Sequence, residues 1–324
     1  MRIVNYAAAA LMLACASYAG AAEQDKNCTF GAAVGQIVPT DCSVFWENAG
    51  KIHCFSSEAS KAEFLKNPEE NLKKAMAFRE KMMVPENKTA AAMEKLSAEQ
   101  VREMLKKASP GNIVDFSGKD LSYNDLRNTD LRYGKFVDTN LFGADLRGSN
   151  FSGADLTKAY MNLARLENVN LSGANLTDAI IFQAIFDKTN FSGANLSNAR
   201  VIGTLGNVNM SGATIKKGRF GLDVGNQPMG QMKFDSVGGN FANADFEGAD
   251  LNIAAFTFGN LSGANLRNTN MYRADLNQAN LTGADLTGAD LTNAEVDGAI
   301  FKDVKGLETV KGFDTVKGKC VGCK

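Results

Sequence analysis

One histidine and a small set of cysteines are the side chains of this 324-residue sequence with the clearest capacity for chemistry. Of the six cysteines, three lie at 28–54 near the histidine, two close the chain as a C-x-x-C pair, and Cys15 lies in the apolar N-terminal run. Imidazole and thiolate are ligands that Zn and Cu prefer. The candidate metal ligands are therefore His53, Cys54, Cys42, Cys28, Cys320 and Cys323.

The same cysteines favour a second interpretation, in which they form disulfides. Cys42 and Cys54 lie almost symmetrically about a predicted turn at 47–50, and Cys28 could pair with either. His53 and Cys54 are neighbours on one predicted strand and point to opposite faces, so they cannot easily bind one ion. The C-terminal pair fits a disulfide or free dithiol better than a metal clip, and Lys324 stands where haem attachment normally has histidine.

The N-terminus has the pattern of a cleaved secretory signal. One basic residue precedes an apolar run from Tyr6 to Ala16, and Ala19-Gly20-Ala21 has the small-x-small form of a cleavage site. We expect residues 1–21 to be removed and the protein to be periplasmic or secreted, where disulfides persist. Lipidation of Cys15 is an alternative that the sequence leaves open. No other stretch approaches the ~20 apolar residues of a membrane span.

A five-residue period dominates the rest of the chain. A large apolar residue recurs every fifth position from Phe116 to Val201, again from Met210 to Phe220, and from Phe241 to Phe301. The phase is interrupted at about 204–208 and at 221–238. The residue two before the large centre is mostly Ala, with some Thr, Ser and Gly, and Asp or Asn commonly stands between them. This period fits neither a helix nor a strand and predicts a chain that turns a corner every five residues.

The pattern A(D/N)LxG resembles the pentapeptide-repeat family. The resemblance implies a right-handed quadrilateral β-helix over residues 112–303, with four repeats per coil and the large centres stacked inside. The predicted fold class is mainly β, with a small α+β N-terminal domain and a connecting helix that caps the solenoid. Some cytosolic members resemble DNA and bind topoisomerases, but the predicted export and the modest negative charge argue against that role and against nucleic acid as a partner.

Four repeats per coil would place positions twenty residues apart on one face. One such face carries outward apolar residues over several coils, which predicts an apolar stripe that something covers. The cover could be the N-terminal domain, the connecting helix or the second interruption, or else a protein partner or a second copy. The candidate interaction surface consists of Phe142, Tyr160, Leu163, Ile180, Phe182 and Ile202.

The segment 24–84 predicts a small α+β domain. Two short apolar strands flank the turn at Glu47–Gly50, and a helical segment follows with Ser57 as N-cap and a second helix that starts near Pro68. The arrangement resembles the YHS family of metal-associated modules through Gly50-Lys51, Phe55, Phe64-Leu65 and Asn67-Pro68-Glu69. Ser56 and Ser60 stand where the family has thiols, and hydroxyls are poor ligands for the metals that thiolates bind.

Two further segments complete the predicted organisation. A linker at 85–111 contains an amphipathic helix with Ser97 as N-cap and Gln100 three residues later, well placed to cap the solenoid. A tail at 304–324 has its own short repeat, VKGLETVKGFDT, and ends in the C-x-x-C pair.

These features predict an exported, non-enzymatic scaffold that binds an unknown protein or itself. The alternative is a periplasmic metal-binding or metal-handling protein that uses the YHS-like domain and the terminal cysteines, with Cu or Zn as the ion. An enzyme is disfavoured because the single histidine has no recognisable nucleophile, and the many Asp residues occupy turn positions.

Overall fold

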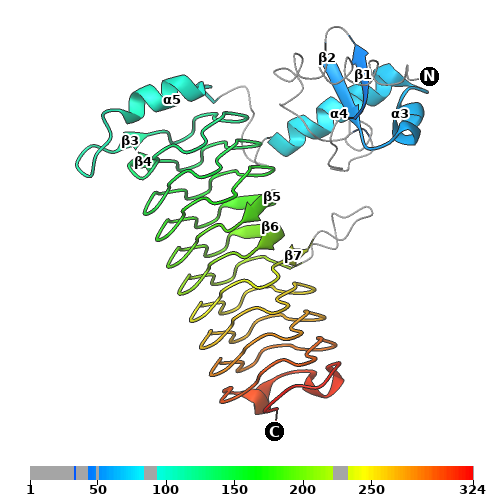
Figure 1. Cartoon of the computed structure of the whole chain (residues 1–324), viewed down its shortest axis with the longest axis vertical. Coiled ribbons are helices and arrows are strands. Elements are labelled where there is room, and N and C mark those ends of the chain that lie inside the picture. Colours follow the sequence, from blue (N-terminus) through cyan, green and yellow to red (C-terminus); the bar gives the residue numbers. More distant parts are fainter. Residues whose placement is uncertain (1–32, 34–42, 49–50, 84–92, 222–232, 324) are drawn as a thin grey trace, which may run out of the picture. The chain divides into compact units, whose positions relative to one another are not determined.

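The computed structural model describes residues 33, 43–48, 51–83, 93–221 and 233–323 (Figure 1). The chain divides into two compact units, Met1–Ala90 and Ala91–Lys324. The predicted signal peptide, Cys28 and Cys42 lie outside the described residues. Within the described ranges, no helix has the length and apolar character needed to cross a bilayer.

The first unit contains a β-hairpin and two helices. Strand β1 (Val44–Asn48) pairs antiparallel with β2 (Lys51–Phe55), and Asn48 lies opposite Lys51. The sequence placed Glu47 and Asn48 in the turn, which is wrong: both continue the ladder and belong to β1.

The two predicted helices of this unit are confirmed. Helix α3 (Glu58–Phe64) begins after Ser57, whose side chain accepts a hydrogen bond from the Ser60 backbone, and helix α4 spans Pro68–Met83. Pro at the first helical position has the fixed φ that a helix start needs. Phe64 packs edge-on against Phe55 with ring centroids 5.3 Å apart, and both are fully buried.

The second unit is a β-solenoid built from the five-residue repeat. Backbone bridges are parallel and join positions twenty residues apart, as from Asn150 to Asn170 and from Asn170 to Asn190. The large centres, such as Leu171 and Leu281, are fully buried, and the small residues two before them are buried with them. Four repeats therefore make one coil, and the rungs of successive coils stack into one continuous core.

At nearly every corner of the coil, the residue two positions after the rung is left-handed. Gly143 has φ 62° and Asn168 has φ 59°, and Gly or Asn occupies most such positions. These residues adopt the left-handed region at little cost, which explains why the repeat contains them. A turn hydrogen bond closes each corner, as from the Ala144 amide to the Leu141 carbonyl at 3.1 Å.

Helix α5 (Ala98–Leu105) caps the start of the solenoid, as the sequence predicted. Ser97 and Gln100 form a reciprocal capping box. Fully buried Val101 belongs to the same core as the rungs, and Leu96 donates its amide to the Asp120 carbonyl at 3.0 Å. The described part of the predicted 85–111 linker is therefore part of the solenoid unit.

The first break in the repeat lies earlier than the sequence suggested. Strand β5 (Ile180–Asp187) pairs with β6 (Arg200–Gly206), and the register shifts between Phe182, which lies opposite Ile202, and Ala184, which lies opposite Gly203. This coil is one residue shorter than its neighbour, and the missing residue falls at Ile202–Gly203 and not within 204–208. The ladder survives because β5 accommodates Gln183 as a bulge.

The second break is an insertion that leaves the coil intact. Asn209 pairs with Asn240, 31 residues on, where other coils need 20. The solenoid resumes at β7 (Phe234–Asp235), which pairs with β6, and Phe234 and Ser236 are fully buried. The second block of repeats therefore starts before Phe241.

The C-terminal segment is not a separate tail. Lys305, Lys311 and Lys317 pair with Asp285, Asp290 and Glu295, so this segment forms the last coil of the solenoid. Each VKG unit has six residues, one more than the other repeats. Short 3-10 helices, η2 (Leu307–Thr309) and η3 (Phe313–Thr315), accommodate the extra residue. The sequence pattern predicted a separate tail at 304–324 because the repeat period changes there from five residues to six.

Substitution of an interior rung tests this register. Leu281→Asp places an unpaired carboxylate in the fully buried core, which costs several kcal/mol and should lower the melting temperature by roughly 10 °C or more. Asn198→Asp, at an exposed left-handed corner, is the matched control and should melt like wild type. Equal melting temperatures for the two variants would refute the register.

Substitution of a strained corner residue should have the opposite effect and stabilise the solenoid. Phe258 has φ 58° and is 62% exposed. A left-handed conformation costs a bulky residue roughly 1 kcal/mol, so Phe258→Asn should raise the melting temperature by about 2–4 °C. Phe258→Leu keeps the unfavourable corner and should show no gain when both are followed by circular dichroism. A lower melting temperature for the Asn variant would contradict the assigned strain.

Candidate functional site

The hairpin separates the predicted metal ligands His53 and Cys54. His53 pairs with Trp46 across the ladder, and the two rings lie side by side with centroids 5.5 Å apart and planes tilted by 34°. Cys54 pairs with Phe45, and it is buried and disulfide-bonded. The two residues point to opposite faces of the hairpin, and a disulfide sulfur is not the thiolate that binds a metal.

No group of three or more His, Cys, Asp or Glu side chains among the described residues is arranged to hold a metal ion. Ser56 and Ser60 lie at the start of α3: Ser60 forms the capping box with Ser57, and the Ser56 and Ser60 hydroxyls lie 3.4 Å apart. A site that included Cys28 or Cys42 stays a prediction, because both lie outside the described residues.

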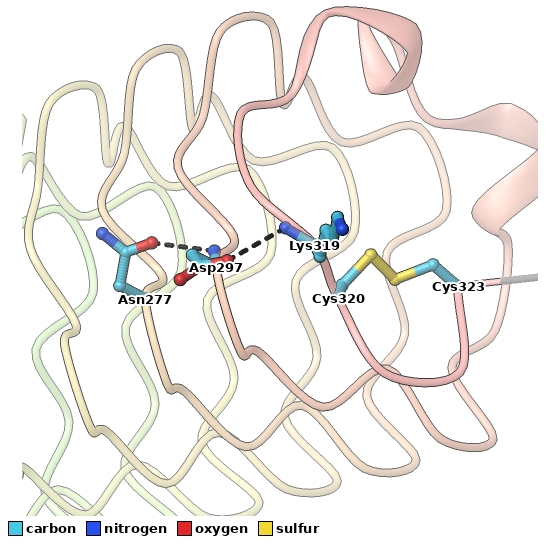
Figure 2. The surroundings of a disulfide bond; sticks show 5 residues. All are labelled: Asn277, Asp297, Lys319, Cys320 and Cys323. Atoms are coloured by element: carbon cyan, nitrogen blue, oxygen red, sulfur yellow. Dashed lines mark hydrogen bonds between the residues drawn. A yellow bond between two sulfur atoms is a disulfide. The ribbon is translucent and has the colours of Figure 1, made fainter.

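The terminal cysteines form a disulfide, the interpretation that the sequence favoured. Cys320 and Cys323 are joined, with Cα atoms 5.9 Å apart, and both pack against the end of the core (Figure 2). The adjacent backbone is tied to the preceding coil, since the Lys319 amide donates to Asp297 at 3.2 Å and the Val321 amide to the Ala299 carbonyl at 2.8 Å. The pair closes the last coil and, while oxidised, offers no thiolate to a metal.

The predicted apolar stripe is not an open surface. Phe142, Tyr160 and Ile202 are 2%, 5% and 0% exposed, and Leu163, Ile180 and Phe182 are half-buried. Phe142 stacks on Tyr160, with centroids 6.1 Å apart, and meets Tyr123 edge-on. Burial raises the pKa of the Tyr160 hydroxyl, which accepts a hydrogen bond from Asn162. The stripe as an interaction surface stays a prediction.

Most solenoid carboxylates and amides are turn residues, as predicted. Asp120 accepts a hydrogen bond from the Ser122 amide at 2.9 Å, and Asn150 accepts one from the Ser152 amide at 3.0 Å. On one face the asparagines also form a ladder between coils, as from Asn190 to Asn170 at 3.2 Å. These side chains already form hydrogen bonds with the backbone and with each other, so they are poorly suited to acid–base chemistry.

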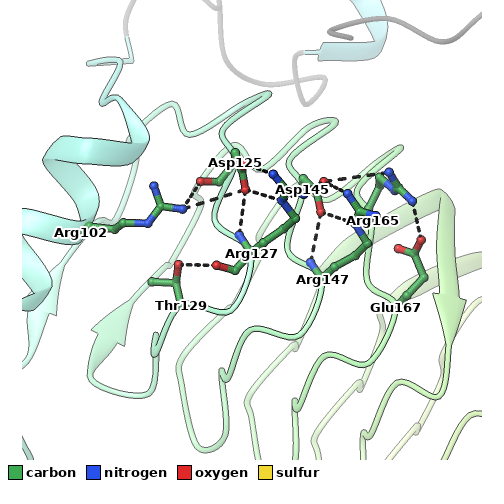
Figure 3. A network of polar contacts seen from close by, with 8 residues as sticks. All are labelled: Arg102, Asp125, Arg127, Thr129, Asp145, Arg147, Arg165 and Glu167. Carbon is green, nitrogen blue, oxygen red and sulfur yellow. Dashed lines mark hydrogen bonds and ion pairs between the residues drawn. The ribbon is translucent and has the colours of Figure 1, made fainter. Parts of the chain in front are cut away.

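A charged network that the sequence analysis missed lies near the N-terminal end of the solenoid (Figure 3). Arg127 forms an ion pair with Asp125 at 2.6 Å, Arg147 with Asp145 at 2.5 Å, and Arg165 with Glu167 at 2.9 Å. Further pairs between coils link these into one strip, and Arg102 of α5 joins its N-terminal end through Asp125. The signal was available in the sequence as charges spaced by twenty residues.

The network shifts the carboxylates toward their charged form. The side-chain hydrogen bond from Arg127 lowers the pKa of Asp125 to about 2. For Asp145, burial would raise the pKa, but the hydrogen bonds from Arg147 and the charge of Arg165 lower it overall. Each carboxylate in this strip has its own guanidinium, and Arg102 adds a fourth cation, so no carboxylate is left without an ion pair and the strip suits a structural role.

The repeat itself identifies the family. The model described as pentapeptide repeats matches in eight copies, over residues 114–215 and 238–305. The chain belongs to the pentapeptide repeat family. Members of the pentapeptide repeat family are commonly protein-interaction proteins.

Solved pentapeptide repeat proteins resemble this chain. HetL, involved in heterocyst differentiation regulation in the cyanobacterium Nostoc sp. strain PCC 7120, is 24% identical over 68% of this chain and 94% of its own, with a TM-score of 0.41. QnrB1, a plasmid-mediated fluoroquinolone resistance protein, is 16% identical over 63% and 92%, with a TM-score of 0.32. No curated protein matches the chain. The family assignment rests on the repeats.

Acid titration tests the charged network. The lowered pKa of Asp125 means that its stabilising effect is present above its ordinary value of 3.8 and is lost as the pH falls toward 2. The side chain is half exposed, so the contribution is at most about 1 kcal/mol. Asp125→Asn should melt slightly below wild type at pH 6, and the two should converge at pH 2.

The control for this titration is Asp178→Asn, which changes an exposed corner carboxylate on another face. It should track wild type at both pH values. A difference between Asp125→Asn and wild type that is as large at pH 2 as at pH 6 would show that the ion pair is not its cause.

Proposed function

We propose that the chain is an exported, non-enzymatic scaffold that binds another protein through the outward faces of its solenoid. The observation that carries the proposal is the filled interior: rungs such as Leu146, Leu171 and Leu281 are fully buried along the length of the repeat. Any ligand must therefore meet the outside of the coils. A rigid solenoid with regularly spaced outward residues suits protein binding.

The proposal has two further parts. The N-terminal unit is a YHS-like module attached to a right-handed solenoid, supported by its hairpin, its α3 cap and the Asn67-Pro68-Glu69 motif. Export is supported by the signal-like pattern of residues 1–21 and by the use of cysteines in disulfides.

Site-specific photo-crosslinking in the exporting host tests the scaffold proposal. A benzophenone amino acid is placed singly at Ser172, Asp178, Ile185 or Phe258, which sample different outward positions of the solenoid. We expect a discrete protein adduct from at least one position in the exported fraction, absent without illumination. A chain that stays in the cytoplasm, or one that gives no adduct from any position, would overturn the proposal.

A further inference from the structure

One face of the solenoid changes character along its length. A single column of outward residues runs from Asp125 through Asp145, Arg165 and Ile185 to Thr204, and continues through Asp235 and Ala255 to Asp275 and Glu295. We name its C-terminal part the acidic half-face, defined by Asp235, Val237, Phe258, Asp275, Glu295 and Asp297.

The carboxylates of the two halves of this face differ in whether they form ion pairs. In the N-terminal half, Asp125, Asp145 and Glu167 each form an ion pair with an arginine. In the acidic half-face, none of the four carboxylates forms an ion pair with a described residue. Lys317 follows Glu295 in the same column on the last coil, and Lys233 and Arg273 lie nearby in the sequence.

Three of the four carboxylates of the acidic half-face accept hydrogen bonds, all from neutral donors. Asp275 accepts hydrogen bonds from the Thr257 hydroxyl at 3.0 Å and the Asn277 amide at 2.9 Å. Glu295 accepts one from the Asn277 side chain at 3.2 Å, and Asp297 one from the Lys319 amide. Asp275 and Glu295 also face each other directly on adjacent coils, an arrangement that like charges disfavour.

Two exposed apolar side chains lie among these carboxylates. Val237 is 52% exposed and Phe258 is 62% exposed, and they lie one position apart on adjacent coils. Phe258 occupies a left-handed corner where Gly or Asn would fold at lower cost. Folding alone favours neither the aromatic residue at this corner nor its exposure to solvent.

We propose that the acidic half-face binds a basic segment of a partner protein, with lysines or arginines flanking an aromatic or aliphatic anchor. The anchor packs on Val237 and Phe258, and the cations meet Asp235, Asp275 and Glu295. Complementary charge on Asp235, Asp275 and Glu295 favours this partner chemistry over an acidic or neutral one. The inference rests on the proposed scaffold function and names the face and the partner class.

Peptide display on the purified full chain tests this assignment. A random twelve-residue library is panned on wild type, and enriched peptides are synthesised and their affinities measured. We expect enrichment of Lys or Arg around Phe, Trp, Leu or Ile, with binding that weakens about tenfold between roughly 50 mM and 500 mM salt. Asp275→Asn with Glu295→Gln, and separately Phe258→Asn, should each weaken binding at least about tenfold.

Matched controls separate recognition from folding. Ile185→Ser removes an exposed apolar residue from the other half of the same face, and Asp178→Asn removes an exposed carboxylate elsewhere; both should bind like wild type. Asn is common at the positions of Asp275 and Phe258 in other repeats, so these variants should keep the fold, which circular dichroism checks.

Three results would overturn the assignment: no enriched peptide, enriched peptides without basic residues, or equal affinity for wild type and the face variants. The scaffold proposal has its own readout. Crosslinks in the host from Ser172 or Asp178, but none from Phe258, would leave that proposal standing while removing this face as the binding site.

Discussion

The structure depends on one local constraint, the left-handed corner that follows nearly every rung. With φ near 60° at Asn168 or Gly143, the chain turns sharply enough that a large residue points inward every five positions. Each coil then hydrogen-bonds to the next in parallel, as from the Leu171 amide to the Asn190 carbonyl at 2.7 Å. Without the corners, the rungs would alternate in and out as in an ordinary strand, and no continuous core would form.

That constraint also determines what the surface can do. The corner takes Gly or Asn, and the position before the rung takes Asp or Asn to cap the turn, as Asp285 does for the Thr287 amide at 3.0 Å. Most outward positions therefore serve the coil itself. Functional residues should be sought where the repeat departs from its own rule, and Phe258 at a corner is such a departure.

The ends of the solenoid follow from the same logic. A stack of parallel coils leaves unpaired backbone groups at both ends, and such edges invite association with other strands. Helix α5 covers the first coil with Val101 in the core, and the last coil is closed by 3-10 turns and the Cys320–Cys323 disulfide. The proposed partner would therefore bind the sides of the solenoid, where the backbone is already paired.

Sequence reasoning recovered what is local and periodic. The rungs, the Ser97 cap of α5, the helix start at Pro68 and the terminal disulfide could all be predicted because each depends on neighbouring residues or on the five-residue period. The last coil was missed because its VKG units have a period of six. The residues of the apolar stripe were expected to point outward from the coil. The repeat predicts this direction for Phe142, but it does not predict that Phe142 is covered by its neighbours Tyr160 and Tyr123.

The charged column shows why long-range pairs escape such reasoning and what they reveal once the coil is closed. Asp145 and Arg165 become neighbours only because four repeats complete a turn. Stability alone would favour ion-paired carboxylates along the whole face, as in its N-terminal half, because stacked like charges such as Asp275 and Glu295 repel. Asparagine at either position would keep the turn hydrogen bond and remove the repulsion, as it does at Asn170 and Asn190. Retaining both carboxylates beside an exposed, strained phenylalanine is unfavourable for the isolated rod and becomes favourable when a cationic partner covers them.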